Sequence, residues 1–380
     1  MSVFVPFNRK ELAVAPKKVL VSGAGVAGEV LAFWLKQHGF SVLVVECATT
    51  HRTGGYDVDF RGPALEILDR MGLIDEVRHR QTPRRETLVL DPEGEPELTV
   101  PPEVFGGDIE IRKGDLIDIL AAATREIPHW FDDTVTALAA QTDGVYVEFR
   151  QGESQVFDLV VGADGVHSTV RSLAFGPERE FAHYLGMMGA GFTAPTIFPP
   201  ADRGFLYRLG GRAAGVSCRA DRQDMQVVFS FATDSPLDDR SDAVRQKVVL
   251  VEQLGDMKWE VPRLLDAMGK VRELYFDPMS QIRMPSWSTD RVVLVGDAAA
   301  CAAPTSGLGT SQAVVAAYVL AGELARNAEH AAAFSEYERQ LRPYVIENQE
   351  IGKRGAEWFL KPEAGQQLEV DPIKMKLKDY

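Results

Sequence analysis

One short stretch, Gly23-Ala24-Gly25-Val26-Ala27-Gly28, constrains the fold of this chain more than any other part of it. An apolar run from Lys18 to Ser22 precedes the stretch, and apolar residues at helical spacing follow it from Val26 to His38. A strand, a glycine-rich turn and a helix in this order are typical of a β-α-β unit that binds a dinucleotide. The alternative is a tight turn with a structural role only.

The spacing of this motif suits a pyrophosphate. Gly23 permits the tight turn, Gly25 lets the backbone approach the phosphates, and Gly28 lets the helix and the strand pack closely. Backbone N–H groups at the start of the helix, together with the helix dipole, favour negative charge there. We therefore predict that a dinucleotide cofactor is bound by Gly23, Gly25, Val26, Ala27 and Gly28.

An acidic residue, Glu46, follows the second strand of the unit. That strand, Phe40 to Val45, is almost wholly apolar, which is the pattern of a strand buried on both faces of a parallel sheet. Glu46 lies 18 positions after Gly28, where an acid hydrogen-bonds the ribose hydroxyls of the adenosine half. A ribose 2′-phosphate would be repelled there, which disfavours a permanently bound NADP and leaves FAD and NAD.

Composition and charge exclude several classes of function. The chain has 380 residues, 45% of them hydrophobic, so about two domains are expected. The formal net charge of -14 argues against a nucleic-acid partner, since phosphate binding needs a basic patch. Short apolar runs and the lack of a signal-peptide pattern predict a cytoplasmic protein without a membrane partner. Cys47, Cys218 and Cys301 form no paired motif, so we predict no disulfide and no bound metal.

Two further glycine-rich stretches follow strand-like runs farther along the chain. Gly162-Ala163-Asp164-Gly165 follows Phe157 to Val161, and Gly296-Asp297-Ala298-Ala299 follows Arg291 to Val295. Between them, Phe192 to Thr233 alternates apolar and polar positions, which predicts an antiparallel sheet with one packed face. Helices are expected at residues 62–71, 115–126, 243–269, 313–325 and 331–349, and a hairpin at 135–150.

In the order and spacing of these motifs, the chain resembles the group A flavoprotein monooxygenases, aromatic hydroxylases with a para-hydroxybenzoate hydroxylase-like fold. The resemblance covers residues 17–350. The stretch Asp158 to Arg171 is similar to the family's "DG" fingerprint, which is associated with FAD and with the pyridine nucleotide that reduces it. Asp164 would hold this loop through hydrogen bonds, and Ser168 and Arg171 match the family pattern. The alternative for Asp164 is a helix cap only.

The resemblance assigns the third motif to the flavin. Asp297 would accept hydrogen bonds from the ribityl hydroxyls of FAD. The loop Pro304 to Ser311 would pass under the isoalloxazine ring, with the next helix pointing its N–H groups at it. Many family members read Gly-Gln-Gly-x-Asn here, whereas this chain has Leu308 and Ser311 at the Gln and Asn positions. The loop residues predicted to contact FAD are Pro304, Gly307, Leu308 and Gly309.

Two arginines also resemble family residues near the cofactor. Arg112, at a predicted helix start, matches an arginine that contacts FAD, and Arg61 matches one near the flavin or nicotinamide path. An exposed arginine is the alternative for Arg112. The stretch Gly54 to Gly62, the apolar helix Ala317 to Leu324 and the chain length are most similar to the tetracycline-inactivating branch of the family.

The resemblance implies an α/β fold with a discontinuous Rossmann-like FAD-binding domain, an inserted antiparallel β-sheet substrate domain and a C-terminal helix. The FAD-binding domain would comprise residues 17–85, 105–177 and 283–342, the substrate domain residues 86–104 and 178–282, and a C-terminal helical segment residues 343–380.

The resemblance also implies an activity. NADPH or NADH would reduce FAD as a transient reductant, and O2 would add to the reduced flavin as a C4a-hydroperoxide. One oxygen would then enter a bulky polycyclic or aromatic substrate by hydroxylation or Baeyer–Villiger insertion, in antibiotic inactivation or natural-product tailoring. The flavin performs this chemistry, so we predict no catalytic side chain and a structural role for His167. We expect the protein to be a monomer.

The substrate is expected between the inserted sheet and the flavin. Its proposed lining consists of apolar residues at alternating positions, for which core packing is the alternative role. Trp358 and Phe359 would cover the entrance, or else dock onto the body of the protein. The predicted substrate-binding residues are Phe192, Phe205, Met225, Phe229, Met284 and Pro304, with Tyr207 and Phe231 as further candidates.

Two other functions stay open at this point. A flavin oxidoreductase without oxygen insertion, similar to geranylgeranyl reductases, shares these glycine motifs. A flavin-bound redox sensor without turnover is the other, because the usual Gln and Asn of the third loop are replaced. Uptake of O2 with NADPH consumption that rises on adding substrate separates a monooxygenase from both.

Overall fold

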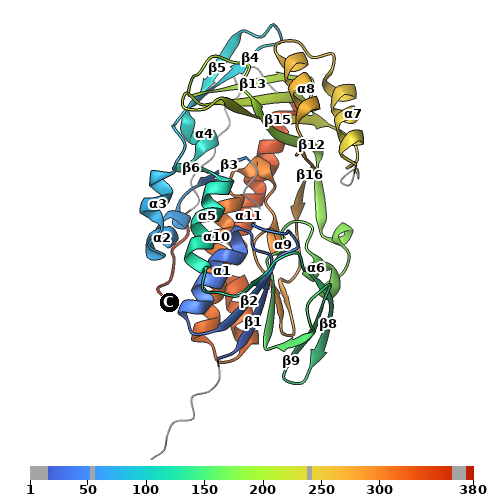
Figure 1. Cartoon of the computed structure of the whole chain (residues 1–380). Coiled ribbons are helices and arrows are strands. Elements are labelled where there is room, and N and C mark those ends of the chain that lie inside the picture. Colours follow the sequence, from blue (N-terminus) through green and yellow to red (C-terminus); the bar gives the residue numbers. More distant parts are fainter. Residues whose placement is uncertain (1–15, 52–55, 238–241, 362–373) are drawn as a thin grey trace, which may run out of the picture.

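The computed structural model describes residues 16–51, 56–237, 242–361 and 374–380, and these form two bodies (Figure 1). Gly54 and Gly55 of the motif quoted above lie outside the described residues. The lower body holds a mostly parallel sheet with helices around it, and the upper body holds a second sheet with two helices on one side. The longest helices are α1 (Val26–Gln37), α5 (Lys113–Thr124), α7 (Ala243–Leu254), α8 (Val261–Lys270), α10 (Gly309–Arg326) and α11 (His330–Leu360).

The sheet of the lower body brings the three glycine motifs together. β1 lies between β2 and β11, and β11 pairs on its other side with β18, all in parallel. Each of β1, β11 and β18 leads into one glycine motif. The carboxyl ends of parallel strands meet at one edge of a sheet, so three motifs far apart in sequence become neighbours. The strand order is β17 (Ser288–Thr289), β18 (Val292–Leu294), β11 (Leu159–Gly162), β1 (Lys18–Ser22), β2 (Ser41–Val45) and β7 (His129–Trp130).

Helices cover this sheet as the apolar spacing predicts. Val30, Leu31 and Leu35 of α1 are fully buried. Helix α10 is buried without interruption from Ser311 to Leu324, because it packs inside the lower body against α1, α2 and α11. The remaining elements are β3 (Asp57–Phe60), α2 (Pro63–Arg70), α3 (Ile74–His79), α4 (Pro102–Gly106), β6 (Ile109–Arg112), β8 (Val135–Gln141), β9 (Gly144–Phe149), β10 (Gln155–Phe157), α6 (Thr169–Ala174), η1 (Glu178–Glu180), α9 (Asp297–Ala300) and η2 (Pro304–Ser306).

The sheet of the upper body has seven strands, and the predicted antiparallel pairing of residues 192–233 is confirmed. One pair differs: β13 and β4 run parallel. β4 precedes the rest of the sheet in the chain and joins its edge beside β13, which no alternation pattern in the sequence could reveal. The order is β16 (Tyr275–Ile282), β12 (Ala182–Pro195), β15 (Asp224–Ala232), β14 (Arg212–Cys218), β13 (Arg203–Leu209), β4 (Glu86–Leu90) and β5 (Pro96–Val100).

The two faces of this sheet have different surroundings. On β15, Phe229 and Phe231 pack in a core cluster with residues of α7 and α8. Their neighbours Val228 and Ser230 point the other way, because side chains alternate along a strand. Phe229 is 0% exposed, whereas Val228 is 46% exposed. The face without α7 and α8 is therefore the one that is open toward the lower body.

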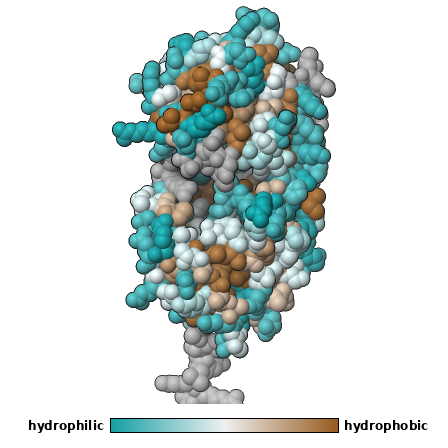
Figure 2. All heavy atoms as spheres, turned by 90° about the vertical axis from the view of Figure 1, so that its right-hand side faces the viewer, coloured by the Kyte–Doolittle hydropathy of each residue, from teal (hydrophilic) through white to brown (hydrophobic). Residues whose placement is uncertain are grey.

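The outer side of the upper body is closed by its helices. Leu250 and Leu254 of α7 are fully buried, whereas Val244 and Val251 of the same helix are exposed. Figure 2 shows this side of the molecule, with hydrophobic residues gathered in one area of the upper body and another of the lower body. In the described part of the chain, no helix is both long and apolar enough to cross a membrane.

Helix α11 connects the two bodies and supports a loop of the lower one (Figure 1). It runs without a break past residue 342, where the sequence predicts a separate segment, and it contains Pro343. A Cβ at Gly352 would lie 2.0 Å from the Ala302 carbonyl oxygen, and one at Gly355 would lie 2.2 Å from that of Thr305. The helix therefore lies directly on the loop that follows α9. The domain boundaries themselves stay a prediction.

An ion-pair triad links the two bodies at His167. Its Nε2 donates to Asp277 Oδ2 on β16 (2.8 Å), and its Nδ1 donates to a Glu178 carboxylate oxygen (3.0 Å). Hydrogen bonds to Asp277 and Glu178 raise the pKa of His167 to about 9, against the opposing effect of partial burial. Because both ring nitrogens donate, this histidine is a charged structural link.

We expect the link at His167 to weaken in alkali. A folded-state pKa raised above the ordinary value stabilises the fold fully below pH about 6.5, and this contribution is lost as the pH rises through about 9. Melting temperatures of the natural protein and of His167→Gln, measured across this range, should differ at the acidic end and converge at the alkaline end. A difference that stays constant with pH would contradict the charged state.

Candidate functional site

A large cavity lies where the ends of β1, β2 and β11 meet the upper sheet. Its volume is about 1380 Å³, and its wall combines the first two glycine motifs with strands of the upper body. Typical small-molecule pockets measure about 300–1,000 Å³, so this one suits a ligand as large as a dinucleotide. Of the predicted cofactor residues, the wall brings together Gly23, Gly25, Glu46 and Asp164.

The glycines of the first motif fit a pyrophosphate cradle. At Gly23, φ is +109°, and a Cβ would lie 2.5 Å from the Ala163 carbonyl oxygen. A Cβ at Gly28 would lie 1.9 Å from the Gly23 carbonyl oxygen. A Cβ at Gly25, by contrast, would meet no protein atom within 4 Å, although Gly25 lines the cavity. Val26 and Ala27 form the first turn of α1 beside it. Two glycines thus serve packing, and the third leaves room for a ligand.

Glu46 is held at the cavity wall by backbone amides. Its Oε2 accepts from the Ala24 N–H (3.0 Å) and its Oε1 from the Ala48 N–H (2.9 Å). Its own backbone joins β7, since Glu46 N donates to the Trp130 carbonyl (2.8 Å). The carboxylate is therefore fixed beside the first glycine motif, at the place where an adenosine ribose is expected.

Asp164 organises the second motif from inside. One of its carboxylate oxygens accepts from Val170 N (3.0 Å), and the other accepts from the Ser168 hydroxyl. The fully buried Arg171 donates to the Ala298 carbonyl (3.1 Å), which ties the second motif to the third. The N-cap of α6 is Ser168, whose hydroxyl accepts from Arg171 N (2.9 Å), so Asp164 supports this cap from the loop while it also lines the cavity.

Asp297 lies half-buried at the start of α9, in the charge environment of the large cavity. Burial raises the pKa of its carboxyl, while Cys301 and Lys113 lower it. Lys113 and Tyr56 line the cavity, and the Lys113 ammonium lies 5.8 Å from the Tyr56 ring centroid. Asp297 itself is not among the residues that line the large cavity, and its connection to that space is the charge of Lys113.

The surroundings of the loop after α9 account for the two residues that depart from the family pattern, Leu308 and Ser311. Leu308 is 1% exposed and packs in the main core, and Gly307 has a left-handed φ of +62°. The fully buried Ser311 accepts a hydrogen bond from Arg61 N (2.9 Å) through its hydroxyl. Leu308 and Ser311 therefore hold the loop in place: Leu308 packs into the core, and Ser311 hydrogen-bonds the backbone of Arg61. Pro304, in contrast, is exposed.

The two arginines have different surroundings. Arg61 donates from Nε to Asp59 (2.7 Å) and from its terminal nitrogens to the carbonyls of Glu103 and Val104 (both 2.8 Å). Burial raises the pKa of Asp59 to about 6, although Arg61 lowers it. Arg112 instead pairs with Asp224 of the upper sheet (3.2 Å), and its neighbour Lys113 lines the cavity.

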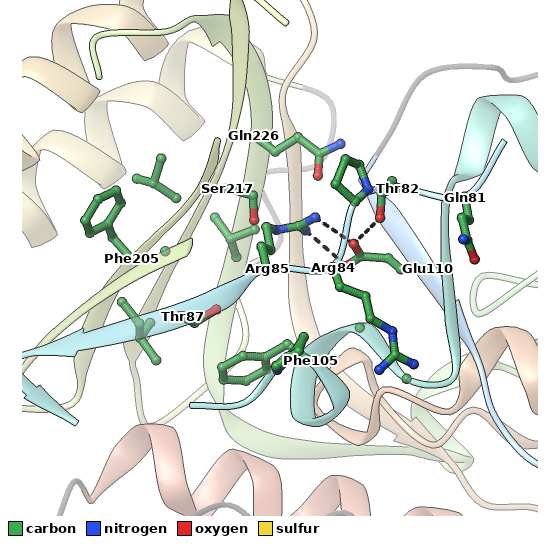
Figure 3. A pocket seen from close by; sticks show the side chains of 18 of the residues that line it. Gln81, Thr82, Arg84, Arg85, Thr87, Phe105, Glu110, Phe205, Ser217 and Gln226 are labelled. Carbon is green, nitrogen blue, oxygen red and sulfur yellow. Dashed lines mark hydrogen bonds and ion pairs between the residues drawn. The ribbon is translucent and has the colours of Figure 1, made fainter. Parts of the chain in front are cut away.

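A second cavity of about 240 Å³ lies under the open face of the upper sheet (Figure 3). Arg85 donates to Glu110 (2.6 Å) and to Asp57 (3.1 Å), and Gln226 donates to Asp57 (2.9 Å). The Thr82 hydroxyl also donates to Glu110. This network forms one polar wall of the cavity. The opposite walls are largely apolar and include Phe105, Leu206, Val228 and Phe359.

Most of the predicted substrate residues lie on the other face of that sheet. Met225 and Phe229 belong to the core under α7 and α8, as do the rings of Phe192 and Phe205, although both of these also touch a cavity wall. The Phe205 ring stacks on Phe198 with centroids 5.1 Å apart and points away from the second cavity (Figure 3). Tyr207 and Phe231 belong to the same core, and Met284 lies in the core of the lower body.

The predicted aromatic residues lie on the other face because side chains along a strand point alternately to its two faces. Shifting by one residue moves a whole set of side chains to the opposite face. The residues that line the second cavity are therefore the intervening small and polar ones, such as Ser217, Gln226 and Val228. The residues predicted from the sequence are mainly aromatic positions on the opposite face, so these lining residues were not among them; the polar half of the same alternation was the available signal.

Comparisons with known proteins agree with this architecture. A family model described as "FAD binding domain" matches residues 17–348. An uncharacterised protein of Mycobacterium tuberculosis (strain ATCC 25618 / H37Rv) is 39% identical over 88% of this chain and 92% of its own length. A flavin-dependent monooxygenase of Legionella longbeachae serogroup 1 (strain NSW150) is 33% identical, with 90% of each chain covered.

A solved structure is similar over nearly the whole chain. The crystal structure of the tetracycline destructase Tet(55) matches with a TM-score of 0.83 and 32% identity, covering 95% of this chain and 92% of that one. The mixed α/β fold with a separate upper sheet and the requirement for FAD are confirmed. The chain belongs to the FAD-binding-domain family of flavin-dependent monooxygenases.

Proposed function

We propose that this protein consumes NADPH or NADH and inserts one oxygen atom of O2 into a bulky polycyclic or aromatic substrate, held in the second cavity and in the part of the large cavity that adjoins it at β15. The observation that carries the proposal is the contact between the two cavities. Gln226 and Val228 of β15 line both, so a ligand in the second cavity lies next to the cofactor space.

Four of the proposed cofactor residues, Gly23, Gly25, Glu46 and Asp164, line the large cavity. The glycines of the first motif and Glu46 would hold the pyrophosphate and adenosine ribose, Asp297 the ribityl chain, and the loop Pro304 to Gly309 the ring. Bound FAD supplies the chemistry, taking electrons from the nicotinamide and delivering one oxygen atom to the substrate while the other leaves as water. The side chains of the protein bind, orient and exclude water.

The lining of the second cavity suggests the substrate class. Apolar walls with Phe105 and Phe359 suit a flat ring system, and Arg85, Ser217 and Gln226 suit oxygen substituents at one edge. A ligand with both features is a polycyclic or aromatic polyketide-like molecule. The tetracycline destructase Tet(55), at 32% identity, makes tetracyclines the first substrates to test. A reductase without oxygen insertion stays the competing function.

The decisive experiment is a substrate panel. The FAD-loaded protein is mixed with NADPH and with tetracyclines, anthracyclines, rifamycins or simple phenols, while NADPH loss, O2 uptake and product mass are followed. We expect at least one polycyclic compound to accelerate NADPH oxidation and to gain the mass of one oxygen atom. Substrate conversion without oxygen gain would favour the reductase, and indifference to every compound would favour a sensor.

Asp297 tests the cofactor site. Asp297→Ala removes the carboxylate expected to bind the ribityl hydroxyls, and hydrogen bonds to a charged group contribute about 1.5–3 kcal/mol. FAD affinity, measured by flavin fluorescence, should therefore fall about 10- to 100-fold. Asp297→Asn keeps one acceptor oxygen and should lose less. Full flavin loading of Asp297→Ala would exclude the proposed role.

Val228 tests the second cavity. Val228 is 46% exposed, so Val228→Trp fills the cavity without disturbing the core. Steric conflict of about 1–3 kcal/mol should raise KM for the substrate by about tenfold or more, and FAD content is measured alongside because Val228 also borders the large cavity. The matched control is Val248→Trp on the outer side of α7, where Val248 is 42% exposed. Equal KM values in the two variants would show that the substrate does not bind in the second cavity.

A further inference from the structure

A buried cluster of one carboxylate and two imidazoles lies in the lower body, outside the linings of both cavities. Glu29 belongs to the first turn of α1, His51 follows β2, and His129 belongs to β7. The Glu29 side chain is 0% exposed, that of His129 10% and that of His51 22%. A carboxylate with no exposure requires compensation by a cation or a proton.

One contact within the cluster, between His129 and Glu29, cannot be a hydrogen bond if the His129 ring is neutral. Nε2 of His51 lies 2.9 Å from Glu29 Oε1, and Nε2 of His129 lies 3.1 Å from the same oxygen. His129 Nδ1 lies 2.8 Å from the Ile127 carbonyl, so this nitrogen carries the hydrogen. In a neutral ring, the lone pair of His129 Nε2 then faces the carboxylate oxygen, which is repulsive unless a positive charge lies between them.

We propose that Glu29, His51 and His129 bind a divalent cation of the zinc type. The three ligand atoms lie within 4.8 Å of one another. Ligands bound tetrahedrally to zinc at about 2.0–2.2 Å lie about 3.3–3.5 Å apart, so the two N–O separations need to open by only a few tenths of an ångström. Two histidines and one glutamate are a known zinc ligand set, and His51, at the exposed edge, leaves the fourth position to water.

The surroundings are those of a supported metal site. The Ile127 carbonyl fixes the tautomer of His129, and the Thr124 hydroxyl donates to the second oxygen of Glu29. Such outer partners orient metal ligands in proteins. Phe131 holds both rings, stacked on His129 with centroids 5.8 Å apart and edge-on to His51 at 4.9 Å.

The bound cation would have a structural role beside the cofactor. It would join α1, the segment after β2 and β7. The same β7 holds Glu46 through the backbone bond from Glu46 N to Trp130 O (2.8 Å). This inference goes beyond the proposed function and differs from the absence of metal predicted from the cysteines, because its ligands are histidine and glutamate drawn from three separate segments.

The test measures metal directly. Full-length protein with FAD is freed of metal by a chelator, then titrated with zinc by calorimetry and analysed by elemental mass spectrometry. We expect one zinc per chain and a melting temperature that rises with zinc concentration, since the ion binds only the folded state. His129→Gln and His51→Gln should each lose this zinc, and Thr124→Val should weaken binding about tenfold.

The control is His183→Gln. His183 makes the same kind of bond, from Nδ1 to the Phe181 carbonyl (3.0 Å), but is exposed, so this variant should keep its zinc. If His129→Gln does not fold, the partly exposed His51 and the outer Thr124 still decide the question. Natural protein that binds no stoichiometric zinc and melts at the same temperature with and without it would overturn the proposal, leaving a protonated imidazolium–carboxylate pair.

Discussion

The proposed cofactor site depends on the close approach of two strand ends, β1 and β11. Ala163 N donates to the Ser22 carbonyl (2.7 Å), and any Cβ at Gly23 would collide with Ala163. Val295 N donates in turn to the Gly162 carbonyl (2.9 Å), so the third strand end joins the same row. Without a glycine at position 23, the first and second motifs would separate, and the cavity between them would lose its floor.

Two ion pairs and one amide–carboxylate hydrogen bond set the upper sheet over this floor. Arg112 with Asp224, Gln226 with Asp57, and His167 with Asp277 each join one residue of the lower body to one of the upper sheet. Removing one partner of a mostly buried pair leaves a charge without compensation, which is costly. These pairs therefore fix how the two bodies meet, and with it the contact between the two cavities at β15.

Helix α11 constrains the proposed cofactor site as well, because it packs against the loop after α9. Gly352 and Gly355 bring its backbone against the loop after α9, so the loop expected under the flavin ring is held between α11 and the segment around Arg61. Phe359, at the end of the same helix, lines the second cavity. One helix thus touches both the proposed ring site and the proposed substrate site.

The sequence alone determined the α/β class and the FAD cofactor, whereas its assignment of individual residues to the cofactor site stays a prediction. A glycine in a tight turn, a buried strand and an acidic residue at the end of that strand are local patterns. What they predict does not depend on the rest of the fold. Leu308 and Ser311 also stood out by sequence, but only packing showed that one fills the core and the other holds Arg61.

The tertiary structure decided which face of the upper sheet meets the cofactor. Alternation defines two faces, and nothing in a strand says which of them α7 and α8 will cover, so Phe229 became core and Val228 became lining. The cluster of Glu29, His51 and His129 was equally hidden, because its members come from three segments that approach only when β2 and β7 pair. Long-range contacts of this kind leave no local pattern in a single sequence.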